Sequence, residues 1–244
     1  NLDLFLDSGA FTNFKSGKEV AKLDDYIHFI KENKKIVWKY INLDVIGDEK
    51  QSQYNFEQME RAGLNPIPVF TRSNISAKEK AEILKKMCDK HEFIALGGVA
   101  GIRTNAGKQY LKNLCHFIKK NTNTKFHILG CGSLSIAKNI RPFSMDSSTS
   151  SSNMAFGAVG LFNKKDRNVV RFNRFCDYKY LKKHETLLKK YGVTPKALHS
   201  DNFWNVGNYD ERVILNQYSY YKMQVFLNKN NILYWQALSM PHLK

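Results

Sequence analysis

The sequence predicts an α/β protein, a (β/α)8 barrel of the TIM type with a basic C-terminal helical extension. Six short apolar segments, suited to strands buried on both faces, alternate with segments of helical spacing up to about residue 146. Such alternation implies parallel strands joined by crossover helices. Polar or glycine-containing turns follow nearly every strand, as at a barrel rim; a doubly wound sheet, the alternative, gathers them at one switch point.

The elements follow from the apolar spacing. The expected strands are residues 2–6, 39–43, 67–70, 93–96, 125–129 and 143–145. The expected helices are residues 23–33, 54–62, 77–90, 108–120 and 135–139. We expect Ser76 and Ser135 to cap their helices and Gly63 to end the second helix. Because a barrel has eight strands, one or two more are expected upstream of Asn1 or after Ser147.

The composition changes after residue 147. The expected segments are a Ser/Thr-rich loop at 147–153, a strand or short helix at 154–161, a basic turn region at 163–174 and packing helices at 178–191 and 210–227. We treat residues 1–244 as one domain. Its first part, 1–150, holds the legible strand–helix units, and 151–244 completes the barrel and a nucleic-acid surface.

The composition and charge of the chain exclude some classes of protein and favour others. The 244 residues are 43% hydrophobic and 13% aromatic, enough to bury a core, which excludes a disordered chain. No apolar run approaches the roughly 20 residues of a membrane span, and no secretion signal opens the chain, so we expect a cytoplasmic location, the host cytoplasm if viral. The 38 Lys and Arg against 22 Asp and Glu, a net charge of +16, favour a polyanionic partner.

The cysteines indicate neither a metal nor a redox site. The chain has four: Cys88, Cys115, Cys131 and Cys176. No two are spaced as Cys-x-x-Cys, which excludes a local zinc knuckle or dithiol motif. We expect free thiols in a reducing compartment, with no metal and no cofactor.

Three aspartates carry the candidate chemistry. Asp7, Asp44 and Asp146 each follow an apolar strand, so a barrel places them on the same rim. Each one alone is also a common turn former or helix cap. Two glycine turns share this rim: Gly97-Gly98 and Gly130-Cys131-Gly132. Carboxylates that converge with bare backbone amides suit nucleophilic or acid–base chemistry on a planar group.

In this order the motifs resemble those of the tRNA-guanine transglycosylases, and more closely their viral relatives that modify DNA. The matching segments are Asp7-Ser8-Gly9-Ala10-Phe11, Asp44-Val45-Ile46-Gly47-Asp48, Leu96-Gly97-Gly98-Val99, His127-Ile128-Leu129-Gly130 and Phe143-Ser144-Met145-Asp146-Ser147. The resemblance covers about residues 6–148. It implies an enzyme that replaces guanine by a free 7-deazaguanine, such as preQ0, through a covalent aspartyl-sugar intermediate.

The resemblance also implies residue roles. Asp146 is the nucleophile at the sugar C1′, and Asp7 is the general acid–base near the leaving base, the division of labour of retaining glycosidases. The implied base-binding residues are Ser8, Asp44, Gly97, Gly98, Val99, Leu129 and Gly130. Phe11 and Phe70 are candidates to stack on the base.

Two departures from the tRNA enzymes point to DNA, and the first is that residues 147–152, directly after Asp146, differ from the Pro-Thr-Arg-type continuation of those enzymes. Those enzymes also carry a Cys-x-Cys-x-x-Cys zinc site after the nucleophile, and here only Cys176 follows Asp146. We therefore expect no zinc subdomain, a monomer, no membrane partner, and DNA as the partner, bound by a basic surface. The expected nucleic-acid-binding residues are Lys164, Lys165, Arg167, Arg171 and Arg174.

Three alternatives stay open. The same chemistry on tRNA is the nearest. A barrel glycoside hydrolase is another, although such enzymes usually employ Glu and a Trp-lined cleft, and Trp38, Trp204 and Trp235 do not fall at strand ends. The last is a non-catalytic basic barrel that binds nucleic acid.

Overall fold

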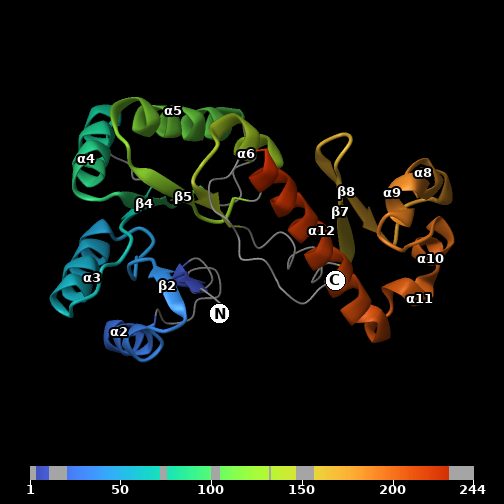
Figure 1. Cartoon of the computed structure of the whole chain (residues 1–244), viewed down its shortest axis with the longest axis horizontal. Helices are drawn as coiled ribbons and strands as arrows, with labels where there is room; N and C mark the ends of the chain where they lie inside the picture. The colour runs from blue at the N-terminus through green and yellow to red at the C-terminus, as the bar shows by residue number, and fades with distance from the viewer. Residues whose placement is uncertain are drawn as a thin grey trace. The chain divides into compact units, whose positions relative to one another are not determined.

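The computed structural model describes residues 4–10, 21–71, 76–99, 105–131, 133–146 and 157–230, and it is a mixed α/β structure (Figure 1). The chain divides into two compact units. The first takes the described residues of Asn1–Cys131 and Pro142–Asp146, and the second takes those of Gly132–Arg141 and Ser147–Gln236. This division differs from the single domain expected from the sequence, because the region after residue 147 has its own core.

The described part of the first unit contains short parallel strands. They are β1 (Leu4–Leu6), β2 (Val37–Tyr40), β3 (Val69–Phe70), β4 (Phe93–Leu96), β5 (Lys125–Ile128) and β6 (Ser144–Met145). β1 pairs with β2, and β3, β4, β5 and β6 pair in chain order. A parallel bridge between Ile41 and Ile67 joins β2 to β3. Along these strands the order never reverses, so they lack the switch point of a doubly wound sheet.

Helices connect the successive parallel strands of this unit. They are α2 (Leu23–Glu32), α3 (Glu49–Arg61), α4 (Ala77–Lys90), α5 (Asn105–Asn121) and α6 (Leu134–Ile140), the last of which clusters with the second unit. Ser76 caps α4 as predicted: its hydroxyl oxygen accepts from the Glu79 amide at 3.2 Å, and the Glu79 carboxylate accepts from the Ser76 amide at 3.0 Å. Gly63, with φ +78°, follows the end of α3, also as predicted.

Two helix starts differ from the prediction. α6 is capped by Ser133, whose Oγ accepts from the Ile136 amide at 3.4 Å, so the expected cap at Ser135 was wrong. α3 begins earlier than expected because Asp48 caps it, accepting from the Gln51 amide at 2.9 Å. Polar first turns hide such starts from an analysis based on apolar spacing.

The sheet of the first unit curves. The Phe5 ring on β1 lies 6.3 Å from the Phe93 ring on β4 and 4.8 Å from the His127 ring on β5, between ring centroids. In a flat sheet the first and fifth strands lie about 19 Å apart. The strands therefore wrap around a shared interior, in which Ile41 and Ala95 are fully buried.

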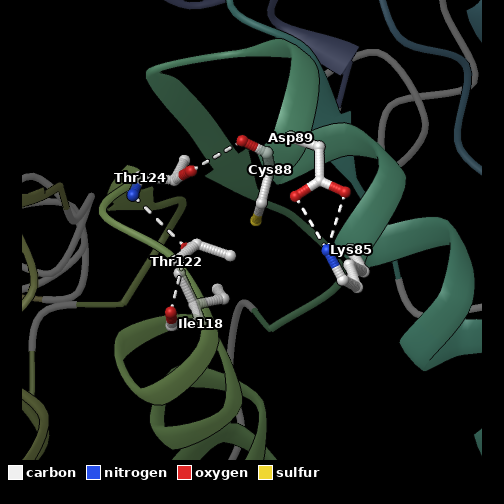
Figure 2. Close-up of polar contacts among 6 residues, drawn as sticks. All are labelled: Lys85, Cys88, Asp89, Ile118, Thr122 and Thr124. Atoms are coloured by element: carbon white, nitrogen blue, oxygen red, sulfur yellow. Dashed lines mark hydrogen bonds and ion pairs between the residues drawn. The ribbon is translucent and has the colours of Figure 1, made fainter.

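Two threonine hydroxyls form hydrogen bonds at the amino end of β5 (Figure 2). The Thr124 Oγ1, next to the start of β5, donates to the Cys88 carbonyl of α4 at 2.9 Å. The Thr124 amide donates to Thr122 Oγ1 at 3.3 Å, and that hydroxyl donates to the Ile118 carbonyl of α5 at 2.9 Å. These bonds tie the ends of α4 and α5 to the segment that leads into β5.

The second unit is an antiparallel hairpin with helices. Its elements are β7 (Ala158–Asn163), β8 (Asn168–Asn173), α8 (Tyr178–Lys183), α9 (Glu185–Lys189), α10 (Pro195–His199), α11 (Asp201–Trp204), the 3-10 helix η1 (Val206–Asn208) and α12 (Tyr209–Lys229). Phe172, Leu181 and Leu188 are fully buried in its core. The expected basic turn region thus contains a strand, and the expected helix at 178–191 is two short helices. The described part of 151–244 forms this core instead of further parallel strands.

Polar side chains of α12 pair with the edge of β7. The Asn216 amide group donates to the Ala158 carbonyl at 3.0 Å and accepts from the Gly160 amide at 2.9 Å, and the Ser219 hydroxyl accepts from the Phe162 amide at 2.7 Å. Both polar residues are fully buried. They satisfy backbone groups of an edge strand, so the last helix packs as predicted, but onto β7.

Candidate functional site

The three predicted aspartates lie at the carboxyl end of the curved sheet. Asp7 directly follows β1, Asp44 follows β2 after the bridge at Ile41, and Asp146 directly follows β6. The negative charges of Asp146 and Asp44 act on Asp7 strongly enough to shift its pKa, so the structure brings the three carboxylates together. They come from the first, second and sixth strands, which only a curved sheet can gather.

Asp7 holds its proton more tightly than an ordinary carboxyl. Part of Asp7 reaches solvent, yet burial by the surrounding protein is the main cause that raises its pKa, and the charges of Asp146 and Asp44 raise it further. A hydrogen bond from the Ser8 amide and the charge of His127 act in the opposite direction. This carboxyl is therefore suited to donating a proton.

Asp146 is oriented through one oxygen. Its Oδ1 accepts from the Gly130 amide at 2.7 Å and lies 3.1 Å from His127 Nε2. The Asp146 side chain is 50% exposed, whereas that of His127 is 5% exposed. Both of these contacts involve Oδ1. The Gly130 amide, expected to contact the base, instead holds this carboxylate.

His127 connects Asp146 to Ser144. The His127 Nδ1 lies 2.8 Å from Ser144 Oγ, and the ring stacks near Phe5 in the interior. Because a carboxylate only accepts, Nε2 carries the hydrogen, and in the neutral ring Nδ1 accepts from the Ser144 hydroxyl. The sequence analysis assigned no role to either residue. The available signal was a histidine between the apolar residues Phe126 and Ile128 of β5.

Asp44 lies deeper than the other two carboxylates. It is 6% exposed, and its Oδ1 accepts from the Ser8 hydroxyl at 2.6 Å. Burial raises the pKa of Asp44, and the hydrogen bond from Ser8 limits the rise. Ser8, expected to contact the base, therefore positions Asp44.

Tyr26 is a buried tyrosine near Asp7 and Asp44. Its hydroxyl donates to the Ile41 carbonyl at 2.8 Å, and its pKa is raised by burial and then by the charges of Asp7 and Asp44. Tyr26 was not predicted as a site residue because it lies on α2, where helical spacing marks it only as a core residue.

The glycine turn after β4 differs in part from the prediction. The Gly97 amide donates to the Phe70 carbonyl at 2.9 Å, so this amide is committed to the sheet and not to a base. A Cβ at Gly97 would lie 2.9 Å from Val69 Cγ1, so packing requires a glycine there. Gly98 has φ +67°, which also favours glycine. The amides of Gly98 and Val99 remain the candidates for contact with a base.

Of the other residues predicted near the base, some lie in the hydrophobic core and the rest lie outside the residues that the structure describes. Leu129 packs on the buried cluster of Ile41 and Ala95, and its amide donates to the Leu96 carbonyl at 3.1 Å. Phe70 is 5% exposed, so it belongs to the core and does not stack on a base. Phe11, Gly132 and Ser147 lie outside the described residues.

All five predicted nucleic-acid residues are exposed in the second unit. Lys164, Lys165 and Arg167 form the tip of the β7–β8 hairpin, Arg171 lies on β8, and Arg174 follows it. The second unit carries 16 Lys and Arg against 6 Asp and Glu, a net charge of +10. The first carries 22 against 16, a net charge of +6. The basic excess is therefore larger in the second unit than in the unit that holds the carboxylates.

The cysteines and the acidic side chains make no metal site in the part of the chain that the structure describes. All four cysteines are free thiols, and burial raises the pKa of Cys115 to about 12, which keeps it protonated. Within the described ranges, no three His, Cys, Asp or Glu side chains are grouped so that they could hold a metal ion.

Comparison with known proteins finds no family model that matches the chain and no matching curated protein. Of the helices in the described ranges, none combines the length and the apolar character needed to cross a membrane.

Proposed function

We propose that the protein is a glycosyl-transferring enzyme that uses two carboxylates at the rim of a β/α barrel. More particularly, it replaces guanine in DNA by a free 7-deazaguanine base such as preQ0. One observation carries the proposal: Asp7, a carboxyl whose pKa is raised by burial and by the charge of Asp146, lies near the exposed and oriented carboxylate of Asp146. Acid-assisted departure and nucleophilic capture at one sugar carbon require this pair.

Asp146 acts as the nucleophile. Its Oδ2 attacks the sugar C1′ as the bond to guanine breaks, which forms an ester-like intermediate that a second base can displace. The Gly130 amide and His127 hold Oδ1 and so aim the other oxygen. In the second step the same donors stabilise the carboxylate as it leaves C1′.

Asp7 moves the proton. Its raised pKa keeps a proton available for the glycosidic nitrogen of the departing guanine. The resulting carboxylate then accepts the proton from the corresponding nitrogen of the incoming 7-deazaguanine. One group thus serves both half-reactions, and the proton count is unchanged at the end of the cycle.

Asp44 recognises the base edge. The Ser8 hydroxyl holds its Oδ1, and its other oxygen accepts from the ring N–H and exocyclic amine of a guanine-like base. The Gly98 and Val99 amides are the donors for the base carbonyl. A Cβ at residue 98 is disfavoured by its φ, which keeps this approach open.

The barrel itself is part of the proposal. The chain-order pairing of β1 to β6 and the contacts of Phe5 across the sheet support a closed wall that further strands complete. DNA as the substrate is supported by the net charge of +10 in the second unit. A base within a duplex is out of reach, so the target guanine is flipped out or unpaired.

The test is incorporation of a labelled 7-deazaguanine into guanine-containing DNA and, in parallel, into tRNA. We expect label in DNA with the wild-type protein and none with Asp146→Asn. The matched control is Asp89→Asn, because Asp89 is an exposed carboxylate paired with Lys85 at 2.8 Å on α4 (Figure 2). Label only in tRNA would show that the same site exchanges bases in tRNA and not in DNA. No label in either, with nucleic acid still bound, would favour the non-catalytic barrel.

A further inference from the structure

We propose that the second unit binds single-stranded DNA by stacking a base on Phe175, with Arg174 on the ring and the neighbouring basic side chains on the phosphates. This inference rests on the proposed function only for the identity of the nucleic acid. Its geometry lies entirely within the second unit.

Phe175 is an exposed aromatic side chain on an ordered turn. It is 78% exposed, and the next values among the exposed large apolar side chains in the described ranges are 63% for Ile214 and 52% for Tyr54. The turn joins β8 to α8. The Phe175 amide donates to the Asn173 side-chain oxygen at 3.0 Å, and the Cys176 amide donates to the Asn173 carbonyl at 3.1 Å. The ring is thus presented to solvent by a fixed backbone.

Arg174 occupies the space over this ring. Its guanidinium carbon lies 4.7 Å from the Phe175 ring centroid, a cation–π distance. A planar guanidinium leaves most of the ring accessible, in line with its exposure. A base that stacks on the ring therefore meets an apolar face and a nearby positive charge, the combination used by proteins that bind single strands.

The surroundings of Phe175 are basic. Three further side chains near it in sequence are exposed and positive: Arg171, Lys179 and Lys183. The acidic residues of this stretch are engaged elsewhere. Asp177 caps α8, accepting from the Tyr180 amide at 2.6 Å, and Glu185 pairs with Lys182 at 3.1 Å and Lys189 at 3.2 Å. The remaining charge suits a phosphate backbone.

The geometry favours a single strand over a membrane or a protein partner. Two nearby tyrosines are occupied: Tyr178 packs on His199 with ring centroids 5.4 Å apart, and Tyr180 packs on His184 at 4.7 Å. One free ring provides little apolar area for a lipid or protein interface, but it matches the face of one base. Bases in a duplex are already stacked on each other, so the ring selects unpaired DNA.

The test is fluorescence anisotropy of the full chain with a labelled oligo-dT strand and with a duplex of equal length. Phe175→Ala should weaken oligo-dT binding about tenfold and leave duplex binding nearly unchanged. Phe175→Leu, which keeps apolar bulk without a flat ring, should weaken it by a similar factor. The matched control is Phe29→Ala, which removes an exposed phenylalanine, 44% exposed, from α2 of the first unit.

Arg171→Gln sharpens the test, because the loss of one phosphate contact should reduce the salt dependence of binding by about one unit in the log–log slope. Unchanged oligo-dT affinity in Phe175→Ala would overturn the proposal. Equal losses for strand and duplex would also overturn it, as would phosphatidylserine-vesicle binding that depends on Phe175 while oligo-dT binding does not. If the wild-type protein binds oligo-dT through Phe175 but exchanges no base, that result would count against the proposed reaction alone.

Discussion

The amino and carboxyl ends of the parallel strands in the first unit carry different kinds of polar side chain. At the amino ends, the hydroxyls of Thr122 and Thr124 donate to helix carbonyls, and Thr122 also accepts from an amide (Figure 2). At the carboxyl ends, the charges of Asp146 and Asp44 raise the pKa of Asp7, in addition to the larger effect of burial. The first end adds stability, and the second concentrates like charge.

The difference shows which end chemistry can use. The threonine hydroxyls are neutral and hydrogen-bonded, so they are poor proton donors and poor nucleophiles. Crowded carboxylates keep a proton where an ordinary one would lose it, and their repulsion destabilises the folded chain. Substitutions of the carboxylates should therefore lower activity and relieve repulsion in the folded chain. Substitutions of the threonines should lower stability and leave activity unchanged.

The largest expected effect comes from Asp7→Asn. Loss of the proton donor should lower the rate of guanine exchange about a thousandfold, because general acid catalysis contributes about 10² to 10⁴. The measurement is single-turnover release of guanine from DNA. Release of 7-methylguanine, which departs without a proton, should be nearly normal. An equal loss for both bases would contradict the acid role of Asp7.

Replacement of His127 should have the next largest effect. His127→Phe keeps the ring beside Phe5 but removes the donor to Asp146, so the exchange rate should fall about tenfold to a hundredfold. KM for the free base should change little, because His127 contacts the nucleophile and not the base-edge residues. His127→Gln, which can still donate, should recover part of the rate. A change confined to KM would contradict a positioning role.

The pH dependence of stability should distinguish Asp44→Asn from the wild type. Asp7 and Asp44 have raised pKa values, so above about pH 4 the folded chain binds more protons than the unfolded chain, and stability falls as the pH rises through the raised values. Asp44→Asn removes one such group and also removes the charge of Asp44 that raises the pKa of Asp7. The amide oxygen of the variant can still accept from the Ser8 hydroxyl. We expect thermal unfolding to shift less between pH 4 and neutral pH. A steeper shift in the variant would refute this reading.

The smallest expected effect is at the other end of the strands. Thr124→Val removes the donor to the Cys88 carbonyl and should lower the free energy of unfolding by about 1 kcal/mol. Urea denaturation measures this change. Base exchange should be unaffected, and a parallel loss of activity would show that the two ends are coupled.

Local features were accessible from the sequence because their causes are local. The capping box of Ser76 and Glu79 and the glycine after α3 depend on residues within one helical turn. Strand β4 matches its predicted span because its residues are apolar throughout. The start of α3 was missed because its first turns are polar and its cap, Asp48, is a common turn residue.

The sequence by itself determined the strand–helix alternation and the placement of Asp7, Asp44 and Asp146 after apolar strands, since both depend on the order of side chains along the chain. Only the tertiary structure decided which groups are free to react. Ser8 holds Asp44 across 36 residues, and His127 holds Asp146 across 19. The Gly97 amide is consumed by the neighbouring strand. Hydrogen bonds of this kind depend on strand pairing and curvature, because backbone and side-chain donors take whichever acceptor the fold brings within about 3 Å.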